Sequence, residues 1–314
     1  MEAQRKSRKK NPSKTPKLPQ DFGAALKSFQ GYLEGTEKAL HTVKSYRLDL
    51  LAFDKFLRSS FQKLMPLDQV GSKDLEAYHG YLKTQGLKTN TRRRMLMTVR
   101  RFLGFLHQRK KIPIDLGRTL LTPLKLERIP LTLPMDDLLN AIQELPQVSA
   151  IEGRNRVLLW TLAETGCLVS EIGKARFDNF VKEDGGHFLQ IDGKAPRKVP
   201  VSGALFGAVQ KLSGESASRS PWVFLGHNKF GSLGGPISPR GVELLVQSFA
   251  QRARFEAMTP RTFRHSAVMH WFRQGLEPDE VQKRLGLKSK YAFRAFQSVI
   301  KSAAKSSADS TSNA

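Results

Sequence analysis

The stretch Thr-Pro-Arg-Thr-Phe-Arg-His-Ser, residues 259–266, begins a run that we predict to be helical through residue 300. Residues three apart on a helix share a face, so Arg261 and Arg264 are expected to lie side by side. Together they can bind a phosphate group. We expect Arg264 to be exposed, so that its replacement by alanine weakens binding without altering the fold.

Three other segments accompany this stretch in the chain. They are Glu-Thr-Gly-Cys-Leu-Val-Ser-Glu-Ile at 164–172, Gly-Lys-Ala-Pro-Arg-Lys-Val-Pro-Val at 193–201, and Val-Gln-Lys-Arg-Leu-Gly-Leu at 281–287, which continues to Phe296. Residues 187–201 predict two short strands around a turn. Helices are predicted over residues 135–144 and about 154–164, and a further helix is expected to begin at Ser238-Pro239.

Composition and periodicity divide the chain into parts. Residues 1–20 are rich in Lys, Arg, Pro and Ser, so we predict a basic disordered arm. Residues 21–112 show helical stripes, such as Val43, Tyr46, Leu50, Phe53 and Leu57. Four prolines within residues 112–134 break this periodicity. We therefore place a linker at 113–127, a second domain at 128–304 and a flexible tail at 305–314.

The charge of the chain points to a polyanionic partner. Lys and Arg total 52 and Asp and Glu total 28, which gives a net charge of +24. The first 20 residues carry seven basic residues and one acidic residue, so +18 remains on the rest of the chain. Lys and Arg that neutralise phosphates release condensed counterions, which favours nucleic acid. A basic surface without a specific partner is a weaker interpretation. An anionic membrane surface is another, and no amphipathic anchor helix supports it.

Other classes of function lack support in the sequence. No apolar run is long enough to span a membrane, and no apolar stretch follows the basic N-terminus as in a signal peptide. The single cysteine, Cys167, excludes an internal disulfide. His265 and His270 are five residues apart and share no helix face suited to a metal. We expect a cytoplasmic protein, nucleoid-associated if bacterial, with no cofactor, metal, membrane or small-molecule substrate.

In order and spacing, the four segments resemble the tyrosine recombinase (phage integrase) family, including its Xer-type members. The resemblance covers residues 20–303 approximately, and Thr42–Arg47 and Arg93–Leu106 resemble helices of that family's core-binding domain. It implies a mainly α protein with a small antiparallel β-sheet. A helical core-binding domain at 21–112 and a catalytic-type domain at 128–304 would form a clamp around double-stranded DNA.

The family cleaves one DNA strand with a tyrosine hydroxyl, while arginines, a histidine and a turn lysine stabilise the reacting phosphate. Several family positions hold other residues in this chain. The first arginine falls on Leu168, the histidine of His-x-x-Arg on Arg261, the histidine of Leu-Gly-His on Leu287, and the tyrosine on Phe296. The matching residues are Lys194 for the turn lysine, Arg264 for the second arginine, and His265 beside it.

These departures predict DNA binding without strand cleavage. Phenylalanine has no hydroxyl, and each lost charge-stabilising donor typically costs about 10²–10³ in rate. The predicted DNA-binding residues are Lys194, Arg261 and Arg264, together with Arg93, Arg94, Arg100 and Arg101 of the first domain. We expect Arg94 and Arg101 opposite the apolar stripe of their helix, where a solvated face is the simpler interpretation.

Alternatives remain open. The chain could be a divergent integrase active in DNA integration and site-specific recombination, using another nucleophile such as Tyr291. It could be an accessory subunit of an active recombinase, an assembly with a second copy of itself, or a mobile-element remnant. Cys167 is expected to be a core residue of an apolar helix.

Overall fold

The computed structural model describes residues 22–36, 40–61, 67–126, 130–216, 220–227 and 233–297. The predicted basic arm, residues 1–20, and the predicted flexible tail, residues 305–314, lie outside these ranges. The chain divides into two compact units, Met1–Glu127 and Arg128–Ala314. Each unit has its own hydrophobic core.

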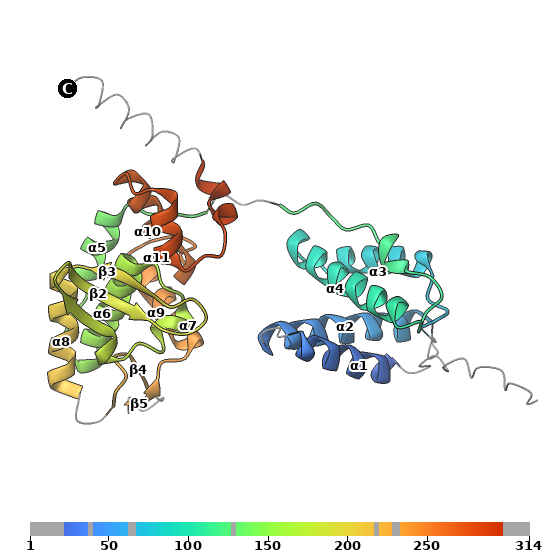
Figure 1. Ribbon diagram of the computed structural model, residues 1–314, viewed down its shortest axis with the longest axis horizontal. Coiled ribbons are helices and arrows are strands. Elements are labelled where there is room, and N and C mark those ends of the chain that lie inside the picture. The colour runs from blue at the N-terminus through green and yellow to red at the C-terminus, as the bar shows by residue number, and fades with distance from the viewer. Residues whose placement is uncertain are drawn as a thin grey trace, which may run out of the picture. The chain divides into compact units, whose positions relative to one another are not determined.

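The first unit is a helical bundle (Figure 1). It contains α1 (Phe22–Gly35), α2 (Leu40–Phe61), α3 (Ser72–Thr84), α4 (Thr89–Gln108) and the 3₁₀ turn η1 (Leu116–Arg118). Its core is rich in aromatic side chains, because Phe29, Phe53, Tyr78 and Phe102 are fully buried. The predicted helical stripe from Val43 to Leu57 is confirmed, since its members are buried except for the half-buried Tyr46.

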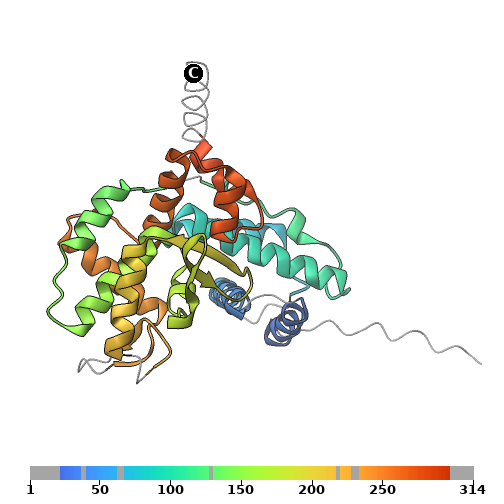
Figure 2. The same ribbon diagram turned by 60° about the vertical axis from the view of Figure 1, so that its left-hand side comes forward.

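The second unit contains a three-stranded antiparallel sheet. Strands β1 (Phe180–Glu183), β2 (Gly186–Ile191) and β3 (Arg197–Val201) follow one another in the order β1-β2-β3. The two strands and turn predicted within residues 187–201 are confirmed, with His187 opposite Val201 and Ile191 opposite Arg197. Helices α6 (Ala150–Thr165) and α8 (Gly203–Ser216) pack against the sheet, as the two views show (Figures 1 and 2).

The remaining elements complete this unit. They are α5 (Met135–Gln143), α7 (Val169–Ile172), η2 (Phe177–Asn179), the hairpin β4 (Leu225–His227) and β5 (Leu233–Pro236), α9 (Pro239–Arg252), α10 (Pro260–Arg273), α11 (Pro278–Leu285) and η3 (Lys290–Phe296). The predicted start of α9 is confirmed, because the Ser238 side chain accepts a hydrogen bond from the Gly241 backbone N–H and Pro239 follows it.

The prediction of one helical run over residues 259–300 is wrong in its continuity. The chain leaves the helix at Gln274 and again at Gly286, which has a φ of 62°. A glycine adopts this left-handed conformation without the steric cost of a side chain, and so ends α11. Residues 260–296 therefore form three separate elements, α10, α11 and η3, instead of one continuous helix.

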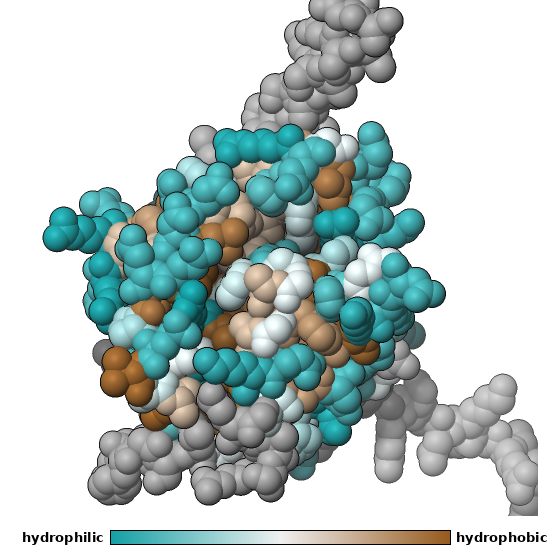
Figure 3. All heavy atoms as spheres, turned by 90° about the vertical axis from the view of Figure 1, so that its left-hand side faces the viewer, coloured by the Kyte–Doolittle hydropathy of each residue, from teal (hydrophilic) through white to brown (hydrophobic). Residues whose placement is uncertain are grey.

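A mainly α protein with small antiparallel sheets is thus confirmed. Among the described residues, no helix combines the length and the apolar character that crossing a bilayer requires. The face seen in Figure 3 is largely hydrophilic, and its hydrophobic side chains form small separate patches.

Candidate functional site

One cavity of the second unit is lined by all seven residues that the family resemblance singled out. Its volume is about 960 Å³. The seven residues are Leu168, Lys194, Arg261, Arg264, His265, Leu287 and Phe296. They come from the start of α7, the β2–β3 turn, α10, the turn after α11, and η3. Segments that are far apart in the sequence therefore meet at a single site.

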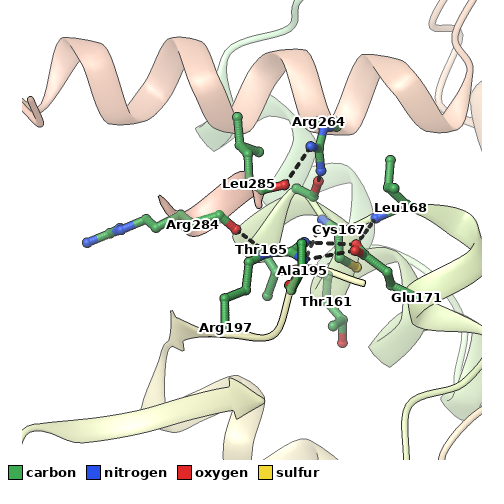
Figure 4. A network of polar contacts seen from close by, with 11 residues as sticks. Thr161, Thr165, Cys167, Leu168, Glu171, Ala195, Arg197, Arg264, Arg284 and Leu285 are labelled. Atoms are coloured by element: carbon green, nitrogen blue, oxygen red, sulfur yellow. Dashed lines mark hydrogen bonds and ion pairs between the residues drawn. The ribbon is translucent and has the colours of Figure 1, made fainter. Parts of the chain in front are cut away.

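Arg264 lies in the floor of this cavity and holds the ends of two helices. Its Nη1 donates a hydrogen bond of 2.7 Å to the Gly166 carbonyl oxygen, and its Nη2 donates one of 2.9 Å to the Leu285 carbonyl oxygen (Figure 4). The last carbonyl groups of a helix have no partner within the helix and carry partial negative charge. The guanidinium group supplies that partner at the ends of α6 and α11.

The expectation that Arg264 is an exposed side chain is therefore wrong. The residue is half-buried, and burial is the main cause that lowers the pKa of its guanidinium group. The negative charge of Glu171 acts in the opposite direction. Arg261 is the exposed member of the pair on α10.

A second arginine, Arg197, lies beside the site and was not predicted from the sequence. Its side chain is 7% exposed and forms an ion pair with both carboxylate oxygens of Glu171, at 2.9 Å each. Its Nε donates to the Arg284 carbonyl oxygen at 2.7 Å, and its Nη1 also donates to the Ala195 carbonyl oxygen at 3.1 Å (Figure 4). Arg197 thus joins β3 to α7 and α11.

The strand period contains a signal for this burial. Side chains two apart in a strand point to the same face, and Arg197 is in phase with the buried Val199 and Val201. The chain also approaches closely at this point. A Cβ atom on Gly286 would lie 2.8 Å from Arg197 Nη1, so a side chain at this position would displace the guanidinium group.

Leu168, Leu287 and Phe296 stand where the family has polar residues, and the structure shows the surroundings of each. Leu168 is 45% exposed at the start of α7, and its backbone N–H donates to Glu171 Oε2 at 2.7 Å. Leu287 is half-buried against the core. Phe296 is 4% exposed, and its ring packs edge-on to His265 with centroids 5.9 Å apart. None of these side chains can donate a hydrogen bond or attack a phosphate.

Two further titratable groups that line the cavity, His265 and Cys167, are uncharged at neutral pH. Burial lowers the pKa of His265, and the nearby charge of Arg261 lowers it further, so the imidazole is neutral at neutral pH. Burial raises the pKa of the Cys167 thiol to about 11. Cys167 is a core residue as expected, but it lies between α6 and α7, not within a helix. The side chain of Tyr291 lies outside the described residues.

Four exposed cations surround the mouth of the cavity: Lys174, Lys194, Arg261 and Lys288. Within the part of the chain that the structure describes, none of them forms an ion pair. Sequence reasoning singled out Lys194 and Arg261 and missed the other two. Apart from positive charge, no local motif marks Lys174 or Lys288.

The four predicted arginines of α4 belong to the first unit and are not part of this cavity. Arg94 forms an ion pair with the buried Asp49 of α2, and Arg101 contacts the hydroxyl group of Tyr46 at 3.3 Å. Both residues are exposed, as expected for positions away from the buried stripe of α4, and each also contacts a side chain of α2. Arg93 donates to the Pro123 carbonyl oxygen at 2.6 Å.

Arg100 is exposed, and its side chain has no hydrogen bond or ion pair within the described ranges. It lines a groove of about 640 Å³ in the first unit. Arg94, Arg101, Arg118, Tyr32 and Tyr46 line the same groove. The first unit thus has a basic groove of its own.

Comparison with known proteins gives matches to both units. The family model described as "Phage integrase family" matches residues 133–297, and "Phage integrase, N-terminal SAM-like domain" matches residues 26–110. The chain is 31% identical over 264 residues to tyrosine recombinase XerD of Rhizobium meliloti, covering 79% of this chain and 81% of that protein. It is 29% identical over 252 residues to tyrosine recombinase XerC of Staphylococcus haemolyticus, covering 78% and 82%.

Solved structures share the fold. The XerH site-specific recombinase bound to its difH substrate superimposes with a TM-score of 0.65 at 19% identity, covering 82% of this chain and 77% of that one. A lambda integrase dimer bound to a COC′ core site gives a TM-score of 0.64 at 15% identity, covering 86% and 96%.

Proposed function

Because this chain belongs to the phage integrase family of tyrosine recombinases, we propose that it binds double-stranded DNA and does not cleave it. One observation carries the proposal. The positions that supply the nucleophile and two charge-stabilising donors in the family hold Phe296, Leu168 and Leu287, and all three line one cavity. The departures from the family pattern are therefore gathered at a single site.

The chemistry of strand cleavage explains why these departures matter together. Cleavage requires a hydroxyl group to attack the phosphorus, and fixed cationic donors must meet the charge that develops on the phosphate oxygens. Phe296 carries no hydroxyl group. Arg264 donates its hydrogen bonds to backbone carbonyl oxygens. The side chain of Arg197 forms an ion pair with Glu171 and is nearly fully buried. The cavity thus lacks an identified nucleophile and two of the charged donors.

DNA binding needs less than cleavage. Phosphate contacts from Lys and Arg supply affinity without a demanding geometry. Lys194 and Arg261 are exposed at the cavity, and Arg100 is exposed in the groove of the first unit. The similar structures of XerH and lambda integrase hold DNA, which supports the same class of partner for this chain.

We assign the domains on the same basis. Residues 21–112 form the core-binding domain, 113–127 the linker and 128–304 the catalytic-type domain, each contributing a basic surface to a clamp on the duplex. The two family matches, which begin and end close to these bounds, support the assignment. Because its proposed partner is DNA, the protein is expected in the cytoplasm, associated with the nucleoid if it is bacterial. A second copy of the chain, or an active recombinase, is its expected protein partner.

The test is a retention assay on fragmented genomic DNA. The purified protein is bound to the fragments, washed with native buffer, and then washed with denaturing detergent. We expect DNA to be retained through the native wash and lost in detergent, with affinity that falls steeply as salt rises. DNA that survives the detergent is covalently attached, which would refute the proposal in favour of a divergent recombinase. No retention in native buffer would refute DNA binding itself.

A further inference from the structure

Part of the positive charge of the cavity comes from residues outside the family's charged positions. Two of those positions, 168 and 287, are leucines in this chain. The cavity nevertheless has four exposed cations at its mouth, of which Lys174 and Lys288 correspond to none of the family residues considered above. Each of these lysines lies near one of the leucines in the sequence.

Lys174 follows α7, the short helix that begins directly after Leu168. Lys288 directly follows Leu287 in the turn after α11. Both side chains are exposed and line the cavity, so both can reach a ligand at its mouth. Arg264 and Arg197, by contrast, are engaged with protein groups.

Within the described part of the chain, neither lysine is engaged in an ion pair, whereas two other lysines of the same unit are. Lys198 forms an ion pair with Glu183, and Lys290 forms one with Asp279 at 2.8 Å. Lys174 and Lys288 have no such partner among the described residues. Two carboxylates also line the cavity. Glu171 is neutralised by Arg197, and Asp192 accepts hydrogen bonds from Asn179 at 3.0 Å and Gln190 at 3.2 Å.

We propose that Lys174 and Lys288 bind the DNA backbone at the mouth of this cavity, together with Lys194 and Arg261. The inference rests on the proposed function and names the residues that carry it. A lysine ammonium group binds phosphate as a point charge, without the bidentate geometry of arginine. Such contacts add affinity in the ground state, but they do not place donors against the developing charge of a transition state.

These lysine contacts account for binding, and the leucines at positions 168 and 287 account for the proposed absence of cleavage. Charge held against the reacting oxygens would stabilise the transition state, whereas charge that only contacts the backbone adds affinity and leaves it intact. The cavity thus becomes an anchoring site on the duplex. Sequence is read by contacts to the bases and not to phosphates, so these lysines should bind all duplexes alike.

The first experiment measures affinity for a fluorescently labelled duplex over a series of salt concentrations. The double variant Lys174→Ala/Lys288→Ala is compared with wild type and with the matched double variant Lys182→Ala/Lys211→Ala. The control lysines are also exposed and lie in β1 and α8 of the same unit, away from the cavity lining. Both double variants remove the same net charge.

Loss of two phosphate contacts should lower the slope of log K against log salt by about 1.8, at about 0.9 per contact. We expect the cavity variant to show this change and a loss of affinity of about 10–100-fold at moderate salt. The control should keep the wild-type slope. Equal losses in the two variants, or no loss in the cavity variant, would overturn the inference and leave the proposed function standing. Absence of binding by the wild type would instead overturn the proposed function.

A second measurement avoids dependence on the folding of a variant. Exposed lysines of the wild-type protein are acylated with and without duplex DNA, and the modified peptides are quantified by mass spectrometry. Bound DNA should protect Lys174 and Lys288 and leave Lys211 reactive. Equal reactivity of Lys174 and Lys288 with and without DNA would contradict the proposed contact, whatever the variants show.

Discussion

Replacing Arg197 by alanine should strongly destabilise the second unit, whereas the same change at Lys198 should not. The two residues are neighbours in β3, and each forms an ion pair with a glutamate. The Arg197–Glu171 side chains are 7% and 18% exposed, and the Lys198–Glu183 side chains are 46% and 45% exposed. Burial is therefore the main variable that separates them.

The expected loss in the free energy of unfolding depends on whether the glutamate partner is left buried without a counter-charge. Removing one partner of a buried ion pair typically costs about 3–5 kcal/mol, because the other charge stays buried without compensation. Glu171 keeps some contact with water and with the Leu168 N–H. The Arg284 and Ala195 carbonyl oxygens also lose a donor. We expect a loss of about 3–4 kcal/mol for Arg197→Ala, against about 0–1 kcal/mol for an exposed pair such as that of Lys198.

Tryptophan fluorescence in a urea titration measures this unit alone. The chain has three tryptophans, and all of them, Trp160, Trp222 and Trp271, lie in the second unit. The double variant Arg197→Ala/Glu171→Ala should be more stable than the sum of the single losses predicts, because it leaves no unpaired charge. A loss below about 1 kcal/mol for Arg197→Ala, or strict additivity in the double variant, would refute the reasoning.

Three further predictions concern the floor of the cavity. Arg264→Ala should lower the free energy of unfolding of the second unit by about 2–4 kcal/mol. Two charged hydrogen bonds of about 1.5–3 kcal/mol each are lost, and water replaces them in part. An unchanged urea midpoint would contradict this. Phe296→Tyr restores a hydroxyl group but should form no covalent DNA adduct on a denaturing gel, because positions 168 and 287 still lack charged donors; an adduct would show that those donors are dispensable. Because the pKa of His265 is lowered in the folded protein, the unfolded chain binds a proton at a higher pH than the folded protein does. The contribution of His265 to the free energy of unfolding should therefore be complete above about pH 6.5 and should decrease as the pH falls below that value. The matched variant His265→Gln should lose less stability between pH 7.5 and 5.5 than wild type does, and equal losses would place the titration elsewhere.

The sequence allowed much of the fold to be predicted, because local patterns determine local elements. The alternation around the β2–β3 turn and the Ser238-Pro239 helix start depend only on residues near in sequence. The positions gathered at the cavity followed from the order of the four segments. The break of the last helical run at Gly286 was missed, although its glycine was a visible signal.

The partners of charged side chains could not be predicted in the same way. Arg264 and Arg261 are three residues apart on one helix, yet one holds two helix ends and the other is exposed to solvent. The difference arises from α6 and α11, whose carbonyl ends approach α10 only in the tertiary fold. Arg197 is a similar case, because its glutamate partner is 26 residues away in sequence.

The role of Arg264 also changes how its presence is interpreted. An arginine at a position that matches the family motif suggests a phosphate contact when only the sequence is considered. In the structure, its hydrogen bonds to Gly166 and Leu285 give it a structural role that requires no DNA. A match at this position therefore supports the fold more than it supports phosphate binding. The exposed cations at the mouth of the cavity have no such structural role, so a DNA partner accounts for them more directly than for Arg264.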